Sequence, residues 1–298
     1  MEQQGTDMIT GCYRIMDMTV RITLPADAVI PGNFKKFEVE DCKSGEPDAE
    51  YTIEYTEDIY EVAEALKNRQ KGTFSISRDN FHLFYTEDGE CRFMSLQGKP
   101  VFYGISLLGK NGVCRVWFDV RWKPLLNHDT VFCSLFSLEK CAIQKSAMIL
   151  HSAYICHQGQ AILFSAPSGT GKSTQADLWE KYRGAKTVNG DRSFLAKRDG
   201  RWYASGWPVC GSSEICYNET FPIKAIVMLR QSKTNRVTRP GGIAAFGEVM
   251  SQITINSWDR GFQMKVMDLL EQLLADVPVY VLECDISEEA VACLERAL

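Results

Sequence analysis

The sequence of 298 residues lacks features that mark several common classes of protein. No apolar run approaches the roughly 20 residues that a membrane-spanning helix needs, so we expect no membrane partner. Met1–Thr10 has neither a basic start nor an apolar core and predicts no secretion signal. Neither sign of charge dominates, because the sequence has 33 Lys and Arg residues and 38 Asp and Glu residues, which gives a net charge of −5. That balance argues against broad nucleic-acid binding.

The eleven cysteines are scattered, and no two of them stand as Cys-x-x-Cys. This spacing excludes the usual zinc and thiol-redox motifs. Without a secretion signal, we expect reduced thiols in a cytoplasmic protein. His151, Cys156 and His157 are close enough to suggest a metal site, but a strand with two histidines is the more ordinary explanation.

The length suits two domains, and the sequence pattern changes near residue 140. We expect a β-rich N-terminal domain over residues 1–140 and an α/β domain over residues 141–298, which is α+β overall. In the first domain, the pattern predicts strands at 13–24, 51–56 and 73–77, helices at 59–67 and 130–141, and hairpins around Asp88-Gly89 and Asn111-Gly112.

The second domain alternates expected strands and helices and has no internal repeat. Residues 148–156 and 161–165 predict a hairpin around Gln158-Gly159. Further elements are expected as strands at 222–229 and 279–283, an amphipathic helix at 262–275, and a closing helix at 287–298 that has Ser287 as its N-cap.

The stretch Ser165–Thr174 reads SAPSGTGKST and ends like a phosphate-binding loop. A strand-like run precedes it, and good helix formers follow. Glycines let backbone N–H groups approach phosphate oxygens, and the positive end of the following helix favours the same anion. Ala166 stands where the full pattern has its first glycine. We expect ATP to bind through seven residues: Ser168, Gly169, Thr170, Gly171, Lys172, Ser173 and Thr174. Lys172 would neutralise the β- and γ-phosphates, and the Ser173 hydroxyl would bind Mg²⁺.

Two further residues are candidates for the chemistry of phosphoryl transfer. Asp191 follows Lys172 by 19 residues, at the end of an expected strand, where its carboxylate could reach Mg²⁺; it could also be a turn aspartate. His151 precedes the hairpin that leads into the loop and could act as a base or as a ligand of the acceptor; it could also be structural.

Two neighbouring features have open alternatives. Arg192 could balance phosphate charge or pair with a surface carboxylate. The turn-rich stretch Gly206–Glu214 could line an acceptor pocket, with Glu214 assisting the metal, or could simply connect two elements.

With these residues in place, the sequence resembles the C-terminal domain of HPr kinase/phosphorylase and the superfamily that it shares with phosphoenolpyruvate carboxykinase. The resemblance rests on His151-Ser152-Ala153, the SAPSGTGKST loop and Asn189-Gly190-Asp191-Arg192, and covers about residues 145–285. It implies a P-loop core with a mixed sheet, ATP with a divalent metal, and transfer to a serine hydroxyl.

The resemblance also implies roles for individual residues. Lys172 and Ser173 would bind phosphate and metal, Asp191 would match one of two paired acidic residues, and His151 would match the active-site histidine. The chain departs from the family pattern because Gly190 and Arg192 flank Asp191 where a second aspartate is usual. One carboxylate must then do both jobs, or His151 must help, or the chemistry differs.

The N-terminal part does not match the sensor domain of HPr kinases, and the whole chain looks more like the HPr-kinase-related proteins found near bacterial peptide-modification genes. This similarity implies a protein or peptide acceptor, and the N-terminal domain could dock it; a homo-oligomer stays open. Two other functions also stay open. One is a nucleotide-binding regulatory or interaction protein without catalysis. The other is a small-molecule kinase or carboxykinase-like enzyme in which Arg192 or Arg230 helps to form an anion pocket.

Overall fold

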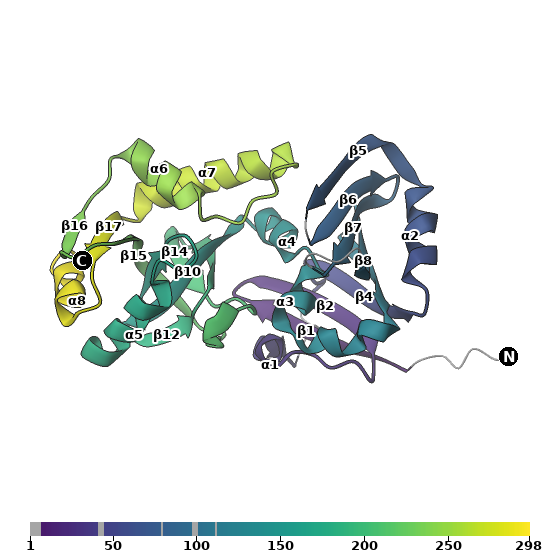
Figure 1. Ribbon diagram of the computed structural model, residues 1–298, viewed down its shortest axis with the longest axis horizontal. Helices are drawn as coiled ribbons and strands as arrows, with labels where there is room; N and C mark the ends of the chain where they lie inside the picture. The colour runs from purple at the N-terminus through teal and green to yellow at the C-terminus, as the bar shows by residue number, and fades with distance from the viewer. Residues whose placement is uncertain (1–6, 41–44, 79, 97–100, 111) are drawn as a thin grey trace. The chain divides into compact units, whose positions relative to one another are not determined.

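The computed structural model describes residues 7–40, 45–78, 80–96, 101–110 and 112–298. The chain divides into two compact units, Met1–Cys141 and Ala142–Leu298. Each unit contains a mixed β-sheet with helices packed on it, so the protein has an α+β fold (Figure 1). Within the described ranges, none of the helices has the length and apolar character needed to cross a bilayer.

The first unit is built on a nine-stranded sheet in the order β3-β1-β2-β4-β9-β8-β7-β6-β5. Adjacent strands are antiparallel, except that β4 is parallel to both β2 and β9. The strands are β1 (Met8–Ile15), β2 (Met18–Pro25), β3 (Glu38–Val39), β4 (Ala49–Thr56), β5 (Gln70–Arg78), β6 (Phe81–Thr86), β7 (Gly89–Ser95), β8 (Phe102–Gly109) and β9 (Val113–Asp119). The helical segments are α1 (Gly32–Lys35), α2 (Ile59–Lys67), η1 (Val120–Asn127) and α3 (Asp129–Ser134), and α4 (Leu138–Gln144) runs across the division between the two units.

Helix α2 begins and ends where the sequence predicts. The Asp58 side chain accepts hydrogen bonds from the first-turn N–H groups of Tyr60 and Glu61, which satisfies two otherwise unpaired donors. The buried α2 residues, Ile59, Ala63 and Leu66, pack with Phe84, Phe93 and other sheet residues in one hydrophobic cluster. The apolar spacing of α2 therefore fixes which of its faces meets the sheet.

A second core in this unit consists of aromatic rings in edge-to-face and tilted contact. The ring centroids of Phe132 lie 4.9 Å from those of both Phe34 and Phe136, in edge-to-face geometry. Tyr51 of β4 joins them through Phe136, with centroids 4.8 Å apart. Helices α1 and α3 thus contribute to one aromatic core, which the sequence spacing alone does not connect.

Three expectations for the first unit are wrong. The single strand expected at 13–24 is the antiparallel pair β1–β2, because Met16 takes a left-handed backbone conformation (φ 54°) and turns the chain. The helix expected at 130–141 breaks into α3 and α4, since Ser137 has φ 49°. Cys12 is disulfide-bonded and not a reduced thiol, whereas nine cysteines of the described part are free.

The hairpin around Asp88-Gly89 is confirmed. The turn residue Asn111 and the expectation for residues 1–6 lie outside the described residues.

The second unit is built on a sheet in the order β11-β10-β13-β14-β15-β17-β16, with β12 paired to β10 and β15 also paired to β11. Its strands are β10 (Ala147–His157), β11 (Gln160–Ser165), β12 (Lys186–Asn189), β13 (Arg192–Arg198), β14 (Arg201–Ser205), β15 (Thr220–Gln231), β16 (Arg236–Thr238) and β17 (Val279–Cys284). Its helical segments are α5 (Lys172–Arg183), η2 (Gly211–Ser213), α6 (Gly242–Met250), α7 (Arg260–Asp276) and α8 (Glu288–Glu295).

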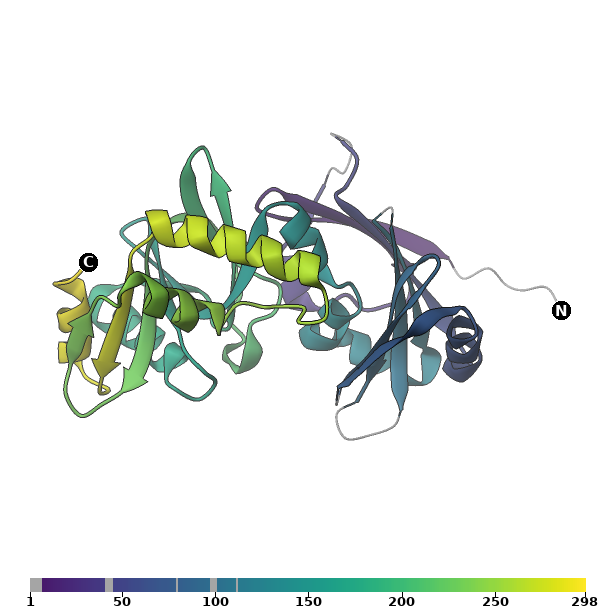
Figure 2. The ribbon, with the colours of Figure 1, turned by 90° about the horizontal axis from the view of Figure 1, so that it is seen from above.

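Helices cover both faces of this second sheet. Figure 1 places α6 and α7 on one face and α5 and α8 on the other, and Figure 2 looks onto the yellow-green α7 from above. Alternate residues of a strand face opposite sides. Ile226 and Met228 of β15 accordingly join the α6–α7 core, whereas Val227 joins the α5–α8 core. The unit is therefore a three-layer arrangement around one sheet.

Most of the expected elements of this unit are confirmed. The hairpin β10–β11 turns at Gln158 and Gly159, which have φ 50° and 74°. The expected strands near 222–229 and 279–283 are β15 and β17, and the expected amphipathic helix is α7. Ser287 caps α8 by accepting a hydrogen bond from the Ala290 N–H, although the helix ends at Glu295. The β13–β14 hairpin was not predicted.

Helix α7 provides a test of this packing. Leu270 on the inner face of α7 is fully buried, whereas the residue Met267 of the same helix is 46% exposed to solvent. We expect Leu270→Ala to lower the free energy of unfolding by about 2–5 kcal/mol, because it leaves a cavity. Met267→Ala, the matched control, should change it by less than about 1 kcal/mol. Urea unfolding followed by circular dichroism measures both. Equal effects of the two variants would contradict the three-layer packing.

Candidate functional site

The glycine loop joins β11 to α5, between two confirmed elements. Gly169 and Gly171 have φ 79° and 113°, in the left-handed region, and a Cβ added at either would meet no atom closer than 4.0 Å. Backbone conformation, not lack of space, therefore calls for glycine at these two positions. The exposed Ser168 and Gly169 lie at the loop's tip, and Gln231 at the end of β15 donates to the Thr170 carbonyl over 3.3 Å.

Lys172 opens α5 and is 7% exposed. Its Nζ donates to the carbonyl oxygens of Ala166 and Pro167 over 3.0 and 3.3 Å, so the ammonium points back into the loop. Burial lowers the pKa of Lys172, Asp191 opposes that shift and Arg192 adds to it, leaving the pKa below its ordinary value. Phosphate oxygens could replace these two carbonyls as acceptors and would supply the negative charge that the buried ammonium lacks.

The N-terminus of α5 is open to an anion. Gly171 is its N-cap, and no side chain of the described residues caps the helix there. The first-turn N–H groups, including those of Ser173 and Thr174, are therefore left for another acceptor, and the helix dipole favours a negative one. Ser173 is exposed, so its hydroxyl is accessible from the solvent.

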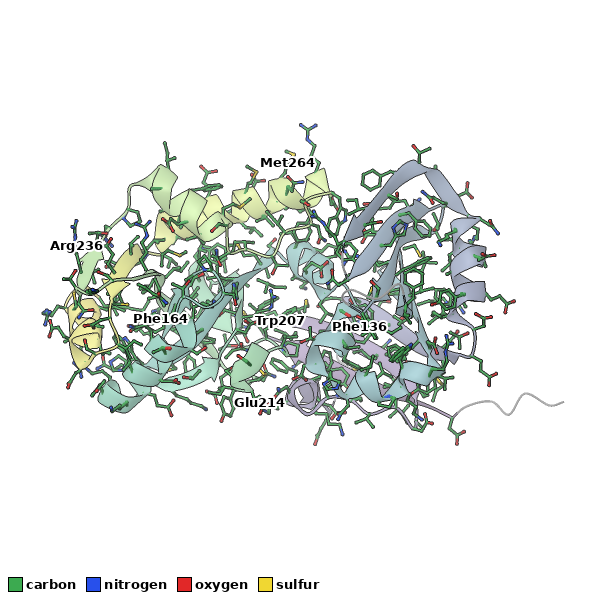
Figure 3. All side chains as sticks on the ribbon, viewed as in Figure 1. Phe136, Phe164, Trp207, Glu214, Arg236 and Met264 are labelled. Atoms are coloured by element: carbon green, nitrogen blue, oxygen red, sulfur yellow. The ribbon has the colours of Figure 1, made fainter. Side chains whose placement is uncertain are left out.

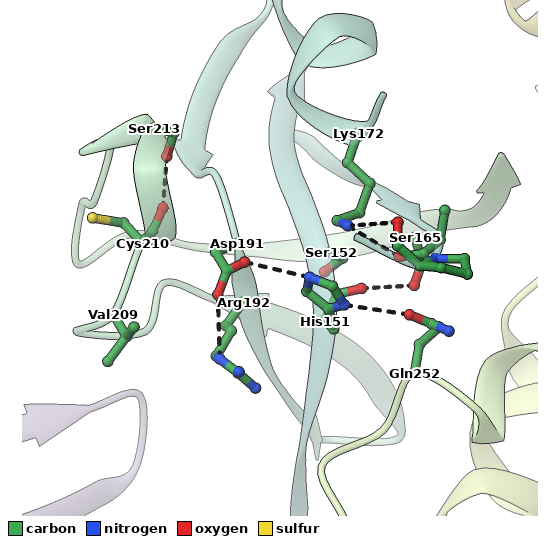
Figure 4. Close-up of polar contacts among 12 residues, drawn as sticks. His151, Ser152, Ser165, Lys172, Asp191, Arg192, Val209, Cys210, Ser213 and Gln252 are labelled. Atoms are coloured by element: carbon green, nitrogen blue, oxygen red, sulfur yellow. Dashed lines mark hydrogen bonds and ion pairs between the residues drawn. The ribbon is translucent and has the colours of Figure 1, made fainter. Parts of the chain in front are cut away.

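The structure brings His151, Asp191 and Arg192 together (Figure 4). His151 lies on β10, and Asp191 lies in the two-residue turn between β12 and β13. His151 Nε2 is 3.3 Å from Asp191 Oδ1, and Arg192 Nε is 3.3 Å from Asp191 Oδ2. The pairing of β10 with β13 brings these residues together, since His151 is opposite Arg192 in the β10–β13 register. Each carboxylate oxygen of Asp191 thus has its own cationic or polar neighbour.

Asp191 is held in its ionised form. Burial would by itself raise the pKa of the Asp191 carboxyl. The hydrogen bond from His151 and the charges of Arg192, His151 and Lys172 act in the opposite direction, and the net pKa lies below the ordinary value. The Lys172 charge is the smallest of these contributions, and it links the carboxylate electrostatically to the glycine loop.

Sequence reasoning missed two residues from the segment after α6. His151 Nδ1 is 3.3 Å from Gln252 Oε1. In addition, the backbone N–H of His151 donates to the backbone carbonyl of Gln252 over 2.9 Å. Arg192 donates to the Thr254 hydroxyl over 3.1 Å. Gln252 and Thr254 lie far along the chain from these partners. No local pattern in the sequence marks them, because only the folding of this segment onto β10 creates the contacts.

The turn before Asp191 has no room for a side chain at position 190. A Cβ added at Gly190 would lie 1.9 Å from Ser213 Oγ and 2.4 Å from Ser213 Cβ. Side-chain atoms never approach this closely, so any residue other than glycine would have to displace η2. Ser213 itself is held by its hydroxyl, which donates to the Cys210 carbonyl over 2.7 Å. In this chain, η2 fills the space that a side chain at position 190 would need.

Other candidate residues do not join the cluster. Glu214 is exposed (Figure 3), and no hydrogen bond or ion pair links it to Asp191 in the part of the chain described. Arg230 forms an ion pair with Glu248. The ring of His157 packs edge-on against Trp179, with centroids 5.2 Å apart, which fits a structural role.

The described residues contain no group of three or more His, Cys, Asp or Glu side chains that could hold a metal ion alone. Mg²⁺ in phosphoryl-transfer sites is commonly held by one or two carboxylates together with substrate phosphates. The single ionised Asp191 and the exposed Ser173 hydroxyl fit that mode of binding and do not fit an all-protein metal cage.

Comparison with known proteins assigns the chain to a family. Residues 125–298, more than half of the chain, match the family described as "SynChlorMet cassette protein ScmC". The chain belongs to this family. No curated protein matches it. A structure described as the Hpr(Ser) kinase/phosphatase from Coxiella burnetii has 11% sequence identity and a TM-score of 0.29, over 50% of this chain and 94% of that one. A likeness at this level does not establish a shared fold or activity.

The lowered pKa of Asp191 predicts how stability depends on pH. A carboxyl whose pKa is depressed by folding stabilises the native state above its unfolded pKa, and the effect is lost as pH falls through the folded value. Asparagine resembles the protonated carboxyl. We therefore expect Asp191→Asn to lower the melting temperature at pH 7, and the gap from the wild type to close progressively as the pH falls below the ordinary aspartate pKa of about 3.9. Thermal melts across this range measure the difference. A gap that widens toward acid would contradict the assignment.

The contact between Gly190 and Ser213 predicts a coupled pair of substitutions. Gly190→Ala should cost about 1–3 kcal/mol of stability because it forces Ser213 aside. Ser213→Gly removes both clashing atoms, so the double variant should recover most of that loss. Gly247→Ala in α6, where an added Cβ meets nothing within 4 Å, is the control and should cost nothing. Additive losses in the double-mutant cycle would show that the contact is not the cause.

Proposed function

We propose that this protein is an ATP-dependent kinase that transfers the γ-phosphate to a hydroxyl, with a serine of a protein or peptide as the acceptor. One observation carries the proposal: an ionised Asp191, held by His151 and Arg192, lies within electrostatic reach of the buried Lys172 of a glycine loop. Phosphoryl transfer needs this combination of a phosphate cradle and a carboxylate. The sequence resemblance to HPr kinases supports the same reaction.

The donor side would be formed by the loop and the start of α5. Loop amides and the uncapped first turn of α5 would bind the phosphate oxygens, and Lys172 would exchange its two loop carbonyls for the β- and γ-phosphates. Ser173 and Asp191 would hold Mg²⁺, which, when bound, neutralises charge on the phosphates. Arg192 is close enough to Asp191 to keep the carboxylate charged and oriented.

On the acceptor side, Asp191 would orient the hydroxyl. The hydroxyl oxygen forms a bond to the γ-phosphorus, the bond between that phosphorus and the β,γ-bridging oxygen breaks, and ADP leaves with the electron pair. The hydroxyl proton passes to the Asp191 carboxylate. A carboxylate of low pKa is a weak base, which suits a loose transition state in which the proton leaves late. His151, in contact with Oδ1, would hold the carboxylate in place and share the proton.

A second candidate function is a nucleotide-binding protein without catalysis. The specific observation in its favour is Gly190, because the HPr kinases that the sequence resembles have a second carboxylate beside the first. The Ser213 side chain occupies the space that a side chain at position 190 would need. This alternative predicts ATP binding with no turnover that depends on Asp191.

Labelled ATP tests the proposal. The protein would be incubated with γ-³²P-ATP, Mg²⁺ and a native extract, and the products separated by size. We expect label on a polypeptide. Lys172→Ala should reduce transfer by about 10²-fold or more, because it removes a charge that stabilises the transition state, and Asp191→Asn by about 10²–10⁴-fold, because it removes the group that orients the acceptor and receives its proton.

Lys181→Ala, on the last turn of the same helix, is the matched control and should retain full transfer. Unchanged transfer by Asp191→Asn would rule out the mechanism. Label found only in ATP and free phosphate, equally for the wild type and Asp191→Asn, would favour the non-catalytic alternative. Label on a small molecule would point to a small-molecule kinase.

A further inference from the structure

The Trp207–Cys216 segment lies directly beside Asp191. It connects β14 to β15, contains η2, and returns to the edge of β12, where Cys216 pairs with Asn189. The Gly190 N–H donates to the Ile215 carbonyl over 3.2 Å, and the Tyr217 N–H donates to the Val188 carbonyl over 2.9 Å. The segment is therefore anchored along the strand that leads into Asp191.

One buried amide joins this segment to the Asp191 turn. Asn189 is fully buried. Its Nδ2 donates to the carbonyls of Trp207 and Val209 over 2.7 and 3.2 Å. Its Oδ1 accepts from the N–H groups of Asp191 and Arg192, each over 2.9 Å. Both donors and both acceptor positions of the amide are used, so no other side chain of this size could replace all four bonds.

The segment also touches Asp191 directly. A Cβ added at Gly211, whose φ is 59°, would lie 3.1 Å from the Cβ and Cγ of Asp191 and 3.2 Å from its Oδ1. Gly211 and Ser212 are both exposed. The Asp191 carboxylate is therefore bordered by an exposed stretch of backbone, and Gly211 leaves the clearance that a side chain would take away.

We infer that Trp207–Cys216 is the acceptor-binding wall of the site, that it takes a polypeptide, and that Asn189 is the positioning residue that holds it against Asp191. The inference rests on the proposed function. A polypeptide is the acceptor of the proposed function, and the exposed Gly211 and Ser212 leave the side of the site beside Asp191 open to the backbone that carries its serine. The loop and Lys172 bind the donor through other elements, β11 and α5, so the two subsites are separable.

The substitution Asn189→Asp separates the two accepted hydrogen bonds of Asn189 from the two that it donates. The carboxylate keeps both acceptor positions for Asp191 and Arg192 but loses both donors and turns negative charge toward the carbonyls of Trp207 and Val209. We expect hydrogen exchange at the Gly190 and Tyr217 amides to accelerate at least about tenfold. Binding of a fluorescent degenerate peptide library with a fixed central serine should weaken at least about tenfold, while the Kd of a fluorescent ATP analogue changes by less than about twofold.

Two further variants keep the test sharp. Asn218→Asp places the same charge on an exposed residue just beyond the segment and should leave peptide binding unchanged. Gly211→Ala keeps the Asn189 side chain, strains the backbone at φ 59° and places a Cβ 3.1 Å from Asp191, so it should weaken peptide binding with a smaller rise in amide exchange than Asn189→Asp. If Asn189→Asp fails to fold, as judged by circular dichroism, Gly211→Ala still decides the point.

Peptide binding and exchange do not depend on turnover, so they can be read even if the wild type transfers no phosphate. If the wild type transfers no phosphate but binds peptide in a way that depends on Asn189, the kinase proposal is wrong and the acceptor-binding wall stands. Three outcomes would overturn the wall: no library peptide bound by the wild type, unchanged peptide binding in both Asn189→Asp and Gly211→Ala, or a nucleotide Kd that rises in parallel with the peptide Kd.

Discussion

The arrangement of the second unit depends on keeping one carboxylate charged while it is mostly enclosed. Removing Asp191 from water disfavours its ionised form, and the structure offsets that cost with His151 on one oxygen and Arg192 on the other. Each partner is in turn held by the segment after α6, His151 by Gln252 and Arg192 by Thr254. Three separate parts of the chain therefore converge to hold a single charge.

Close backbone approach is the second constraint. At Gly190, the side chain of Ser213 occupies the space that a Cβ would need, and at Gly211 the backbone lies against Asp191. The glycine loop differs, since Gly169 and Gly171 are needed for their backbone angles and face open space. One unit thus uses glycine for two physical reasons: to let another segment approach closely, and to adopt left-handed backbone angles.

Local patterns in the sequence predicted the elements that depend on local physics. The helix at 59–67, the Gln158-Gly159 turn and the Ser287 cap were confirmed, because each depends on residues within a few positions of one another. The expected strand at 13–24 was wrong since its turn at Met16 carries no glycine or proline signal. The break at Ser137 escaped prediction for the same reason.

The sequence by itself determined the strand, glycine loop and helix that end in Lys172, and it singled out His151 and Asp191 as candidates. Only the tertiary structure decided that these two side chains meet, since sheet pairing of β10 with its neighbours sets their distance. Asn189, Gln252 and Thr254 acquired their partners in the same way. Glycine loops and helix caps depend on residues that are adjacent in the sequence, so the sequence alone can predict them. The side chains that stabilise the Asp191 charge come from segments far apart in the sequence, and only the folded sheet brings them within hydrogen-bond distance.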